Sequence, residues 1–156
     1  MIHLEEALRR TLARVDVLEP VEVPIGEAAG ATLAVDLVAN ADVPPFDNSA
    51  MDGFAVRVGG LVPGVAVPVT GRIRAGATGD PLEAGVARQI MTGAPVPEGA
   101  DAVVMVEHCT VERDAEGAPT SVVFDPAAFP IEQGRHIRTA GGDLPAGAVA
   151  VHAGGG

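Results

Sequence analysis

The chain has 156 residues, 47% of them apolar, and a formal net charge of −11 at pH 7. This length suits one domain or two small interleaved ones, and the apolar share is ample for a folded core, so disorder is excluded. The acidic balance disfavours a nucleic-acid backbone or an anionic membrane as the main partner, and the lack of any lysine excludes Schiff-base and lysine-based phosphate-loop chemistry.

The first predicted element is an amphipathic helix close to the N-terminus. Its apolar positions recur at helical spacing, namely Leu4, Leu8, Leu12 and Val15. Two pairs four residues apart, Glu5 with Arg9 and Glu6 with Arg10, predict ion pairs on the opposite side. The helix should end before Pro20. Such a helix often packs on a partner subunit, although packing on its own core is the more frequent arrangement.

Short apolar runs punctuated by 20 glycines and 13 prolines predict many short strands and tight turns in the rest of the chain. We expect an extended piece at 21–24 and a helical turn at 26–30, and then strands at 32–39, 54–58, 65–70, 71–75, 87–91, 102–106, 110–113 and 121–124. These strands predict a curled, antiparallel, barrel-like arrangement with a hairpin tip at 114–117. Residues 132–152 suggest a return towards the N-terminal part, and the glycine-rich end at 153–156 is typical of a cut at a linker.

Residues 45–55, Pro-Phe-Asp-Asn-Ser-Ala-Met-Asp-Gly-Phe-Ala, form the most informative stretch. They gather carboxylate, amide and hydroxyl groups without helical or strand periodicity, on Asp47, Asn48, Ser49 and Asp52. The prolines before them restrict the backbone and Gly53 releases it. Acidic groups displayed on a rigid loop are typical of a binding or catalytic site.

The same stretch permits a structural explanation. Residues 49–52, Ser-Ala-Met-Asp, fit the capping-box pattern of a helix N-terminus, which the residues alone favour. A calcium loop is excluded, because counting from Asp47 places Met51 where an oxygen ligand is needed and provides no glutamate at the twelfth position.

A second notable stretch runs from 88 to 107. A strand ends at Thr92 and Gly93, a Pro-x-Pro loop follows, and Asp101 opens a buried strand. The Thr92 hydroxyl and nearby amides are suited to binding an oxyanion or a phosphate, and a plain turn that closes the strand is the alternative.

The other candidate residues give weaker indications of a binding or catalytic site. Arg135 and Arg138 could grip an anion, but in so acidic a chain we expect them to pair with surface carboxylates. The four histidines show no zinc spacing, no nucleophilic-hydrolase motif is present, and Cys109 is expected to be a buried or half-buried thiol. With no apolar run of ~20 residues and no basic leader, a cytoplasmic protein is expected.

Three stretches, 45–55, 90–105 (Ile-Met-Thr-Gly-Ala-Pro-Val-Pro-Glu-Gly-Ala-Asp-Ala-Val-Val-Met) and 134–138 (Gly-Arg-His-Ile-Arg), occur in the order and approximate separation of one family. From the first helix to about residue 151, the chain resembles the N-terminal region of the MoeA-type molybdopterin molybdotransferases, which are related to the E domain of gephyrin. The resemblance implies a β-rich α+β fold of short, coiled and bifurcated β-sheets with an N-terminal amphipathic helix.

The resemblance also implies a domain division and a function. Domain I would comprise residues 1–42 with 130–156, and an inserted, β-rich domain II would comprise 43–129. The family inserts molybdate into adenylated molybdopterin, assisted by Mg²⁺, and releases AMP to give molybdenum cofactor. The chain would supply one wall of the active-site cleft and dimer contacts in a homodimer. The C-terminal domains of the enzyme would be missing, and the fragment alone would be inactive.

By motif matching, the resemblance assigns catalytic roles to Asp52 and Thr92 and ligand-binding roles to Asn48, Ser49 and Gly93. The metal ligands are left open. An alternative function is that of a non-catalytic interaction or scaffold module with the same fold, and the intact Asp52 and Thr92 loops favour the enzyme.

Overall fold

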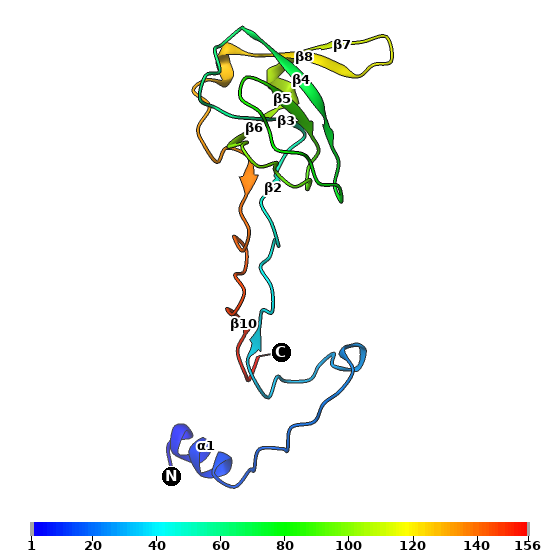
Figure 1. The fold of residues 1–156 in the computed structure, drawn as a ribbon. Coiled ribbons are helices and arrows are strands. Elements are labelled where there is room, and N and C mark those ends of the chain that lie inside the picture. The colour runs from blue at the N-terminus through cyan, green and yellow to red at the C-terminus, as the bar shows by residue number, and fades with distance from the viewer. Residues whose placement is uncertain (1, 156) are drawn as a thin grey trace. The chain divides into compact units, whose positions relative to one another are not determined.

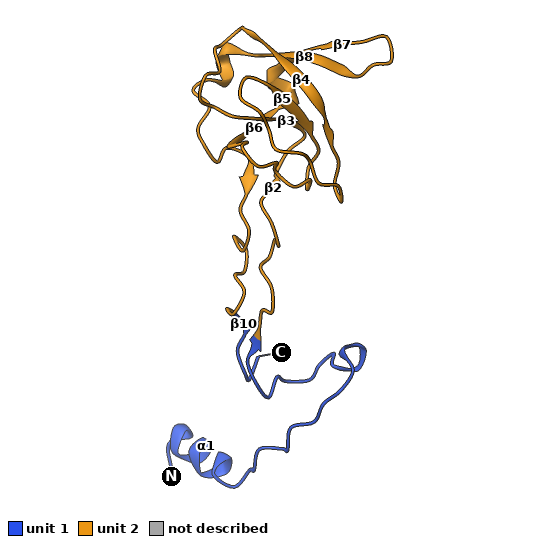
Figure 2. Cartoon of the chain, viewed as in Figure 1, with its two compact units in different colours: residues 1–37, 149–156 blue, residues 38–148 orange. Residues whose placement is uncertain are grey.

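The computed structural model describes residues 2–155 and divides into two compact units (Figure 2). One unit holds residues 1–37 with 149–156, and the other holds residues 38–148. The domain boundaries expected from the sequence, after residues 42 and 129, remain a prediction. Within residues 2–155, no helix combines the length and apolar character needed to cross a bilayer.

The first unit contains helix α1 (Leu4–Leu12) and the 3₁₀ turn η1 (Ile25–Glu27), which confirms both helical predictions. Glu6 accepts from both Arg9, at 2.8 Å, and Arg10, at 2.6 Å, so the predicted Glu5–Arg9 pair is replaced by Glu6–Arg9. None of the described residues of α1 is buried, so packing on its own core, the more frequent of the two arrangements, is not seen. Its apolar face is exposed, with Leu4, Leu8 and Leu12 at 83%, 56% and 59%.

The second unit is built on a six-stranded sheet in the order β6-β3-β5-β4-β8-β7 (Figure 1). Its strands are β3 (Gly53–Val56), β4 (Ala66–Ile73), β5 (Ala87–Ile90), β6 (Ala102–Met105), β7 (Cys109–Arg113) and β8 (Pro119–Phe124). Short 3₁₀ turns follow β6 (η2, Val106–His108) and β8 (η3, Pro126–Ala128). Most of the strands predicted after residue 53 are therefore confirmed to within a few residues.

Three strand predictions need correction. The sheet is not wholly antiparallel, because β4 and β5 run parallel. The two strands predicted at 65–70 and 71–75 are one strand, β4, in which Gly71 adopts a φ of 103° and the register with β5 shifts. Glycine adopts such angles without strain, so the residue that suggested a break instead bends a continuous strand. The strand predicted at 32–39 shrinks to β1 (Leu37–Val38), which pairs with β10 (Val149–Val151).

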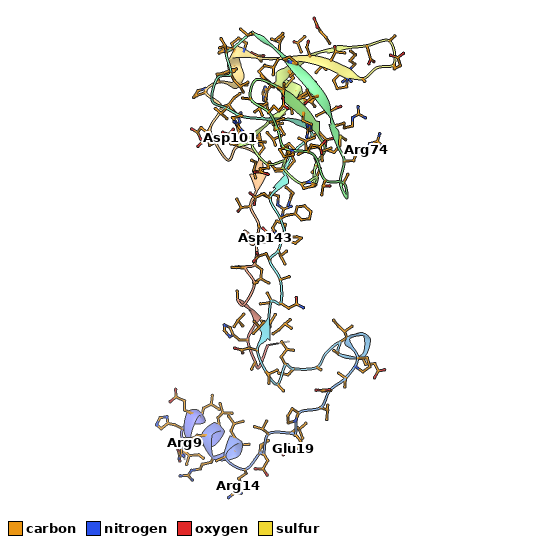
Figure 3. All side chains as sticks on the ribbon, viewed as in Figure 1. Arg9, Arg14, Glu19, Arg74, Asp101 and Asp143 are labelled. Atoms are coloured by element: carbon orange, nitrogen blue, oxygen red, sulfur yellow. The ribbon has the colours of Figure 1, made fainter. Side chains whose placement is uncertain are left out.

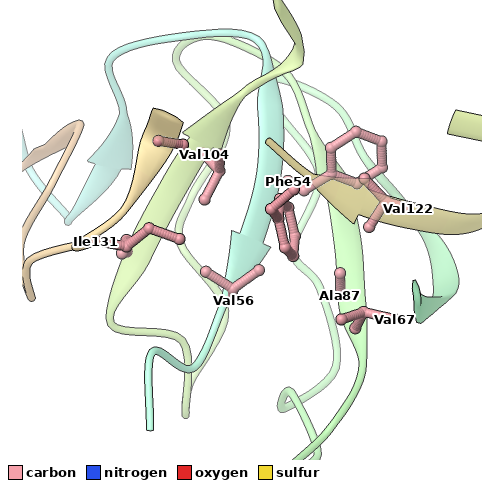
Figure 4. Packing of buried hydrophobic residues seen from close by; sticks show 10 residues of the cluster. Phe54, Val56, Val67, Ala87, Val104, Val122 and Ile131 are labelled. Carbon is pink, nitrogen blue, oxygen red and sulfur yellow. The ribbon is translucent and has the colours of Figure 1, made fainter. Parts of the chain in front are cut away.

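Strand β3 lies at the centre of the core and is buried on both faces, as all four of its residues are buried. Phe54 and Val56 belong to the larger cluster on one face, with Val104 and Phe124 (Figure 4). Ala55, on the other face, packs in a second cluster with neighbours that include Ile73, Ile90 and Val103. Successive side chains of a strand point to opposite faces, so this one strand anchors both clusters. The loop that precedes β3 is therefore attached to a rigid element.

The chain returns along itself within the second unit. Residues 137–148 run beside residues 39–49, and β9 (Ile137–Arg138) pairs antiparallel with β2 (Asn48–Ser49). Two aspartates join these segments, since the Asp42 and Asp47 carboxylates accept from the backbone amides of Ala146 and Ala140, both at 2.8 Å. These contacts confirm the return predicted for the region after residue 132.

Candidate functional site

The side chain of Asp52 contacts Thr92, 40 residues further along the chain. One carboxylate oxygen of Asp52, Oδ1, accepts two hydrogen bonds of 2.7 Å, from the Thr92 backbone N–H and from the Thr92 hydroxyl. Both residues are exposed. The two residues that the family resemblance implies as catalytic are thus brought together at the surface.

The sheet fixes this contact from both sides. Asp52 directly precedes β3, and its carbonyl accepts from the Val106 N–H at 3.1 Å. Thr92 follows β5, which pairs with β3 in the register Gly53 with Ile90. Gly93 then turns the chain with a φ of 77° and donates its N–H to the Ser49 carbonyl at 2.8 Å. Because β3 is fully buried, the Asp52 and Thr92 backbones are held in place.

The contact favours an ionised carboxylate. The Thr92 backbone hydrogen bond, followed by that from the Thr92 hydroxyl, holds the pKa of Asp52 below its ordinary value of 3.8, against a smaller opposing effect of burial. Among residues 2–155, only Thr92 donates to Asp52, and its second oxygen, Oδ2, accepts no hydrogen bond. The capping-box interpretation of 49–52 is wrong, because no helix follows and the Asp52 side chain serves Thr92 instead.

We predict that Thr92→Val raises the pKa of Asp52 towards 3.8. Valine keeps the backbone donor and the shape of the side chain but removes the hydroxyl, so part of the depression should persist. A carboxyl NMR titration of Asp52 measures the change. Thr110→Val, which changes an exposed threonine on β7, is the matched control. An unchanged Asp52 pKa in Thr92→Val would show that the hydroxyl does not stabilise the carboxylate.

The structure buries two of the predicted ligand-binding residues. Asn48 is 6% exposed and donates to the Phe46 carbonyl at 3.2 Å, and Ser49 is 1% exposed and donates to the Met51 carbonyl at 2.6 Å. The Ser49 N–H also donates to the Ala94 carbonyl at 2.9 Å. These groups therefore tie the 45–55 loop to itself and to the loop after Thr92, while Gly93 is exposed.

The basic segment 134–138 supports the same loop, which the sequence did not reveal. The Ala50 N–H donates to the His136 carbonyl at 2.9 Å, next to the β2–β9 pairing. Arg138 pairs with Asp143 at 2.7 Å, as predicted for a surface arginine. Arg135 does not pair with a carboxylate, since it donates to the Ala128 carbonyl at 2.7 Å. Backbone hydrogen bonds place these residues beside the site, and no pattern in their side chains predicts that pairing.

His136 has an unusual backbone and environment. Its φ of 56° lies in the left-handed region, which costs a non-glycine residue roughly 1 kcal/mol. Burial, followed by the charges of Arg135 and His108, lowers the pKa of His136 below its ordinary 6.5. Protonation therefore favours the unfolded chain, so His136 reduces stability increasingly as the pH falls below 6.5, until its folded-state pKa is passed.

We predict that His136→Asn flattens the loss of stability below pH 6.5. Asparagine tolerates the left-handed region and does not titrate, so the variant should differ from the parent chiefly in this pH range. Urea unfolding between pH 5 and pH 8 measures the difference. A parental slope in His136→Asn would contradict the assignment.

No three His, Cys, Asp or Glu side chains in the described part of the chain are grouped to hold a metal. The free Oδ2 of Asp52 does fit one ligand of Mg²⁺, an ion that usually takes one or two carboxylates together with waters and substrate oxygens. Cys109 is half-buried, as predicted, and burial together with Glu107 raises the pKa of its thiol to about 12. It is therefore a poor metal ligand or nucleophile.

Comparison with known proteins shows the family of the chain. The family model described as MoeA N-terminal region (domain I and II) matches residues 2–155. Molybdopterin molybdenumtransferase 2 of Mycobacterium tuberculosis is 43% identical over 141 residues, which are 86% of this chain and 33% of that protein. The molybdopterin molybdenumtransferase of Synechococcus elongatus is 44% identical over 133 residues, or 80% of this chain and 30% of that protein.

A solved structure shows the same fold. The molybdopterin biosynthesis MoeA protein of Pyrococcus horikoshii superposes with a TM-score of 0.80 at 31% identity, over 96% of this chain and 39% of that chain. This match confirms the predicted β-rich α+β fold. The chain spans about a third of the length of the relatives it matches. On this evidence, the chain belongs to the MoeA N-terminal region family.

Proposed function

We propose that this chain is the N-terminal part of a molybdopterin molybdotransferase and supplies one wall of its active-site cleft. The proposal rests on the Asp52–Thr92 contact, which presents an ionised carboxylate at the surface on a rigid sheet. Two relatives that bear the name molybdopterin molybdenumtransferase support it. The substrates would be molybdate and adenylated molybdopterin, and the protein would act in the cytoplasm.

In this proposal, each residue of the site has a stated part. Asp52 keeps a negative charge in place, and its free Oδ2 would hold Mg²⁺, which supplies charge neutralisation for anionic substrates when bound. The Thr92 hydroxyl proton is committed to Asp52, so its oxygen is left to accept from a ligand. Gly93 leaves exposed backbone beside Thr92, while the buried Asn48 and Ser49 act on the ligand through the shape of the loop.

A chimaeric enzyme tests the function. Residues 1–156 would replace the matching third of the M. tuberculosis relative, and AMP release from adenylated molybdopterin in the presence of molybdate would be measured. We expect an active chimaera, and we expect the isolated chain to be inactive because it provides only one side of the cleft. A folded but inactive chimaera would contradict the proposal and favour a non-catalytic interaction module.

The first unit is proposed to supply dimer contacts. In α1, Leu4, Leu8 and Leu12 share one exposed face, and the segment after it adds Leu18 and Ile25, which are 88% and 95% exposed. Large apolar side chains exposed together on one helix face are typical of an interface. We therefore propose that the chain forms a homodimer in which this face is covered. The remaining domains of the enzyme would be its other partners. The division into domain I (1–42 with 130–156) and domain II (43–129) belongs to the same proposal.

We predict that Leu8→Glu weakens self-association. A glutamate at the centre of the α1 face places a charge in the proposed interface, and even one lost apolar contact of leucine size is worth about 2 kcal/mol. Light scattering with size exclusion over a concentration series measures the dimer. Arg10→Gln makes the net charge more negative by the same amount on the opposite side of the same helix and is the control. Equal association of Leu8→Glu and the parent would remove α1 from the interface.

A further inference from the structure

Several chain segments lie at the same end of the sheet as Asp52, where strand β3 begins. Asp52 lies at the start of β3, and Thr92 follows the end of β5, which runs antiparallel to β3. Strand β4 runs parallel to β5, so its last residue lies at this end of the sheet as well. The Met91 N–H donates to the Ile73 carbonyl at 3.1 Å, which places Arg74 beside the approach to Thr92. Since neighbouring strands are about 4.8 Å apart, the end of β4 is about 10 Å from the start of β3.

Two arginines flank this end of β4, Arg72 within the strand and Arg74 directly after it. Both are exposed on either side of the buried Ile73, and the Arg72 side chain leaves the strand on the side opposite to Ile73. The Arg72 Nε donates to the Gln89 side chain at 2.7 Å, which orients its guanidinium group. Among residues 2–155, Arg74 makes no side-chain hydrogen bond or ion pair, and neither arginine contacts a carboxylate. Figure 3 shows Arg74 at the margin of the unit.

The nearby Arg88 differs, because its guanidinium group is used within the fold. It donates to the backbone carbonyls of Thr70 and Asp80 and so holds the 74–80 turn against the sheet. Arg72 and Arg88 line a cavity of about 190 Å³ there, together with Thr70, Thr78 and Asp80. Arg72 thus lines this cavity with residues that carry hydroxyl groups, and Arg74 follows it at the end of β4 that lies nearest to Thr92.

We propose that Arg72 and Arg74 form an anion-binding rim that holds a phosphate group of the ligand whose reacting part lies at Asp52 and Thr92. A chain with a net charge of −11 and a carboxylate in its site repels an anionic ligand unless local cations offset that repulsion. Guanidinium groups bind phosphate bidentately, and a ligand of nucleotide size, larger than a diphosphate alone, has the length to bridge about 10 Å. The ligand class, a phosphate ester or diphosphate, rests on the proposed function.

Inorganic pyrophosphate is the probe for this rim. Isothermal titration calorimetry of the 156-residue chain at low ionic strength would compare the parent with R72Q/R74Q, and R113Q on β7 removes one charge elsewhere as the control. We expect pyrophosphate to bind the parent and the double variant to bind about tenfold more weakly, since two charge-assisted contacts are lost. R113Q should bind like the parent, and about 0.5 M salt should weaken binding to the parent.

The outcomes separate this inference from the proposed function. Asp52→Ala should bind pyrophosphate as well as the parent or better, because it removes a repelling charge. Absence of binding to the parent, or equal binding by R72Q/R74Q, would overturn the rim whatever the chimaera does. In an active chimaera, R72Q/R74Q should raise the KM for adenylated molybdopterin more than it lowers kcat, and an unchanged KM would also count against the rim.

Discussion

Gly53→Ala is expected to lower the free energy of unfolding by about 3 kcal/mol or more, at the upper end of the cost of overpacking a core. An added Cβ at Gly53 would clash with the Val104 carbonyl group, whose carbon would lie only 2.8 Å away. The obstructing atoms belong to the backbone of β6, which pairs with β3 along its whole length. They cannot move aside as a flexible side chain can. Gly53 is thus required for the close approach of two strands.

Urea unfolding measured by circular dichroism tests this expectation, with Gly59→Ala as the matched control. A Cβ added at Gly59 would meet no heavy atom within 4 Å, and the residue has no left-handed φ, so alanine there should be neutral or stabilise by about 0.5 kcal/mol. Similar stabilities of the two variants would show that β3 and β6 can separate at little cost. Because Asp52 precedes Gly53, the Gly53→Ala chain should also lose the Asp52–Thr92 hydrogen bonds, which the Asp52 pKa would report.

The local elements could be predicted because their causes are local. The spacing of Leu4, Leu8 and Leu12 determines a helix, and short branched runs between glycines and prolines determine strands. What the pattern does not contain is which strands become neighbours. The parallel pairing of β4 with β5 and the bend at Gly71 depend on packing across the sheet, so both were missed. The sequence also leaves open what α1 packs against, since a periodic apolar face does not specify what covers it.

The sequence singles out the residues of the candidate site but does not predict the contacts between them. Asp52 and Thr92 stand out in sequence, but their hydrogen bonds join positions 40 residues apart through the β3–β5 register. The capping-box pattern at Ser49 is locally valid and fails because the chain continues into a buried strand. No sequence pattern singles out Arg74, since only the shared direction of β4 and β5 places it at the end of the sheet where Asp52 lies.

Asp52→Ala in the active chimaera is expected to lower kcat by about 100-fold, a loss typical of removing one preorganised electrostatic group from an active site. The change removes the charge that Thr92 holds in place and the free Oδ2 that would contact Mg²⁺. AMP release at saturating substrates measures kcat. Asp114→Asn, at the tip of the β7–β8 hairpin, is the control for a lost carboxylate elsewhere in the unit.

Asp52→Asn distinguishes chemistry from loop support. The asparagine Oδ1 can still accept from the Thr92 N–H and hydroxyl, so the contact between the loops is preserved while the charge is lost. If the carboxylate acts on the ligand, Asp52→Asn should be as inactive as Asp52→Ala. If Asp52 only joins the two loops, Asp52→Asn should keep most of the activity and Asp52→Ala should lose it. Asp52 is exposed, so neither change should lower the unfolding free energy by more than about 1 kcal/mol, and a loss of activity therefore reports on the site.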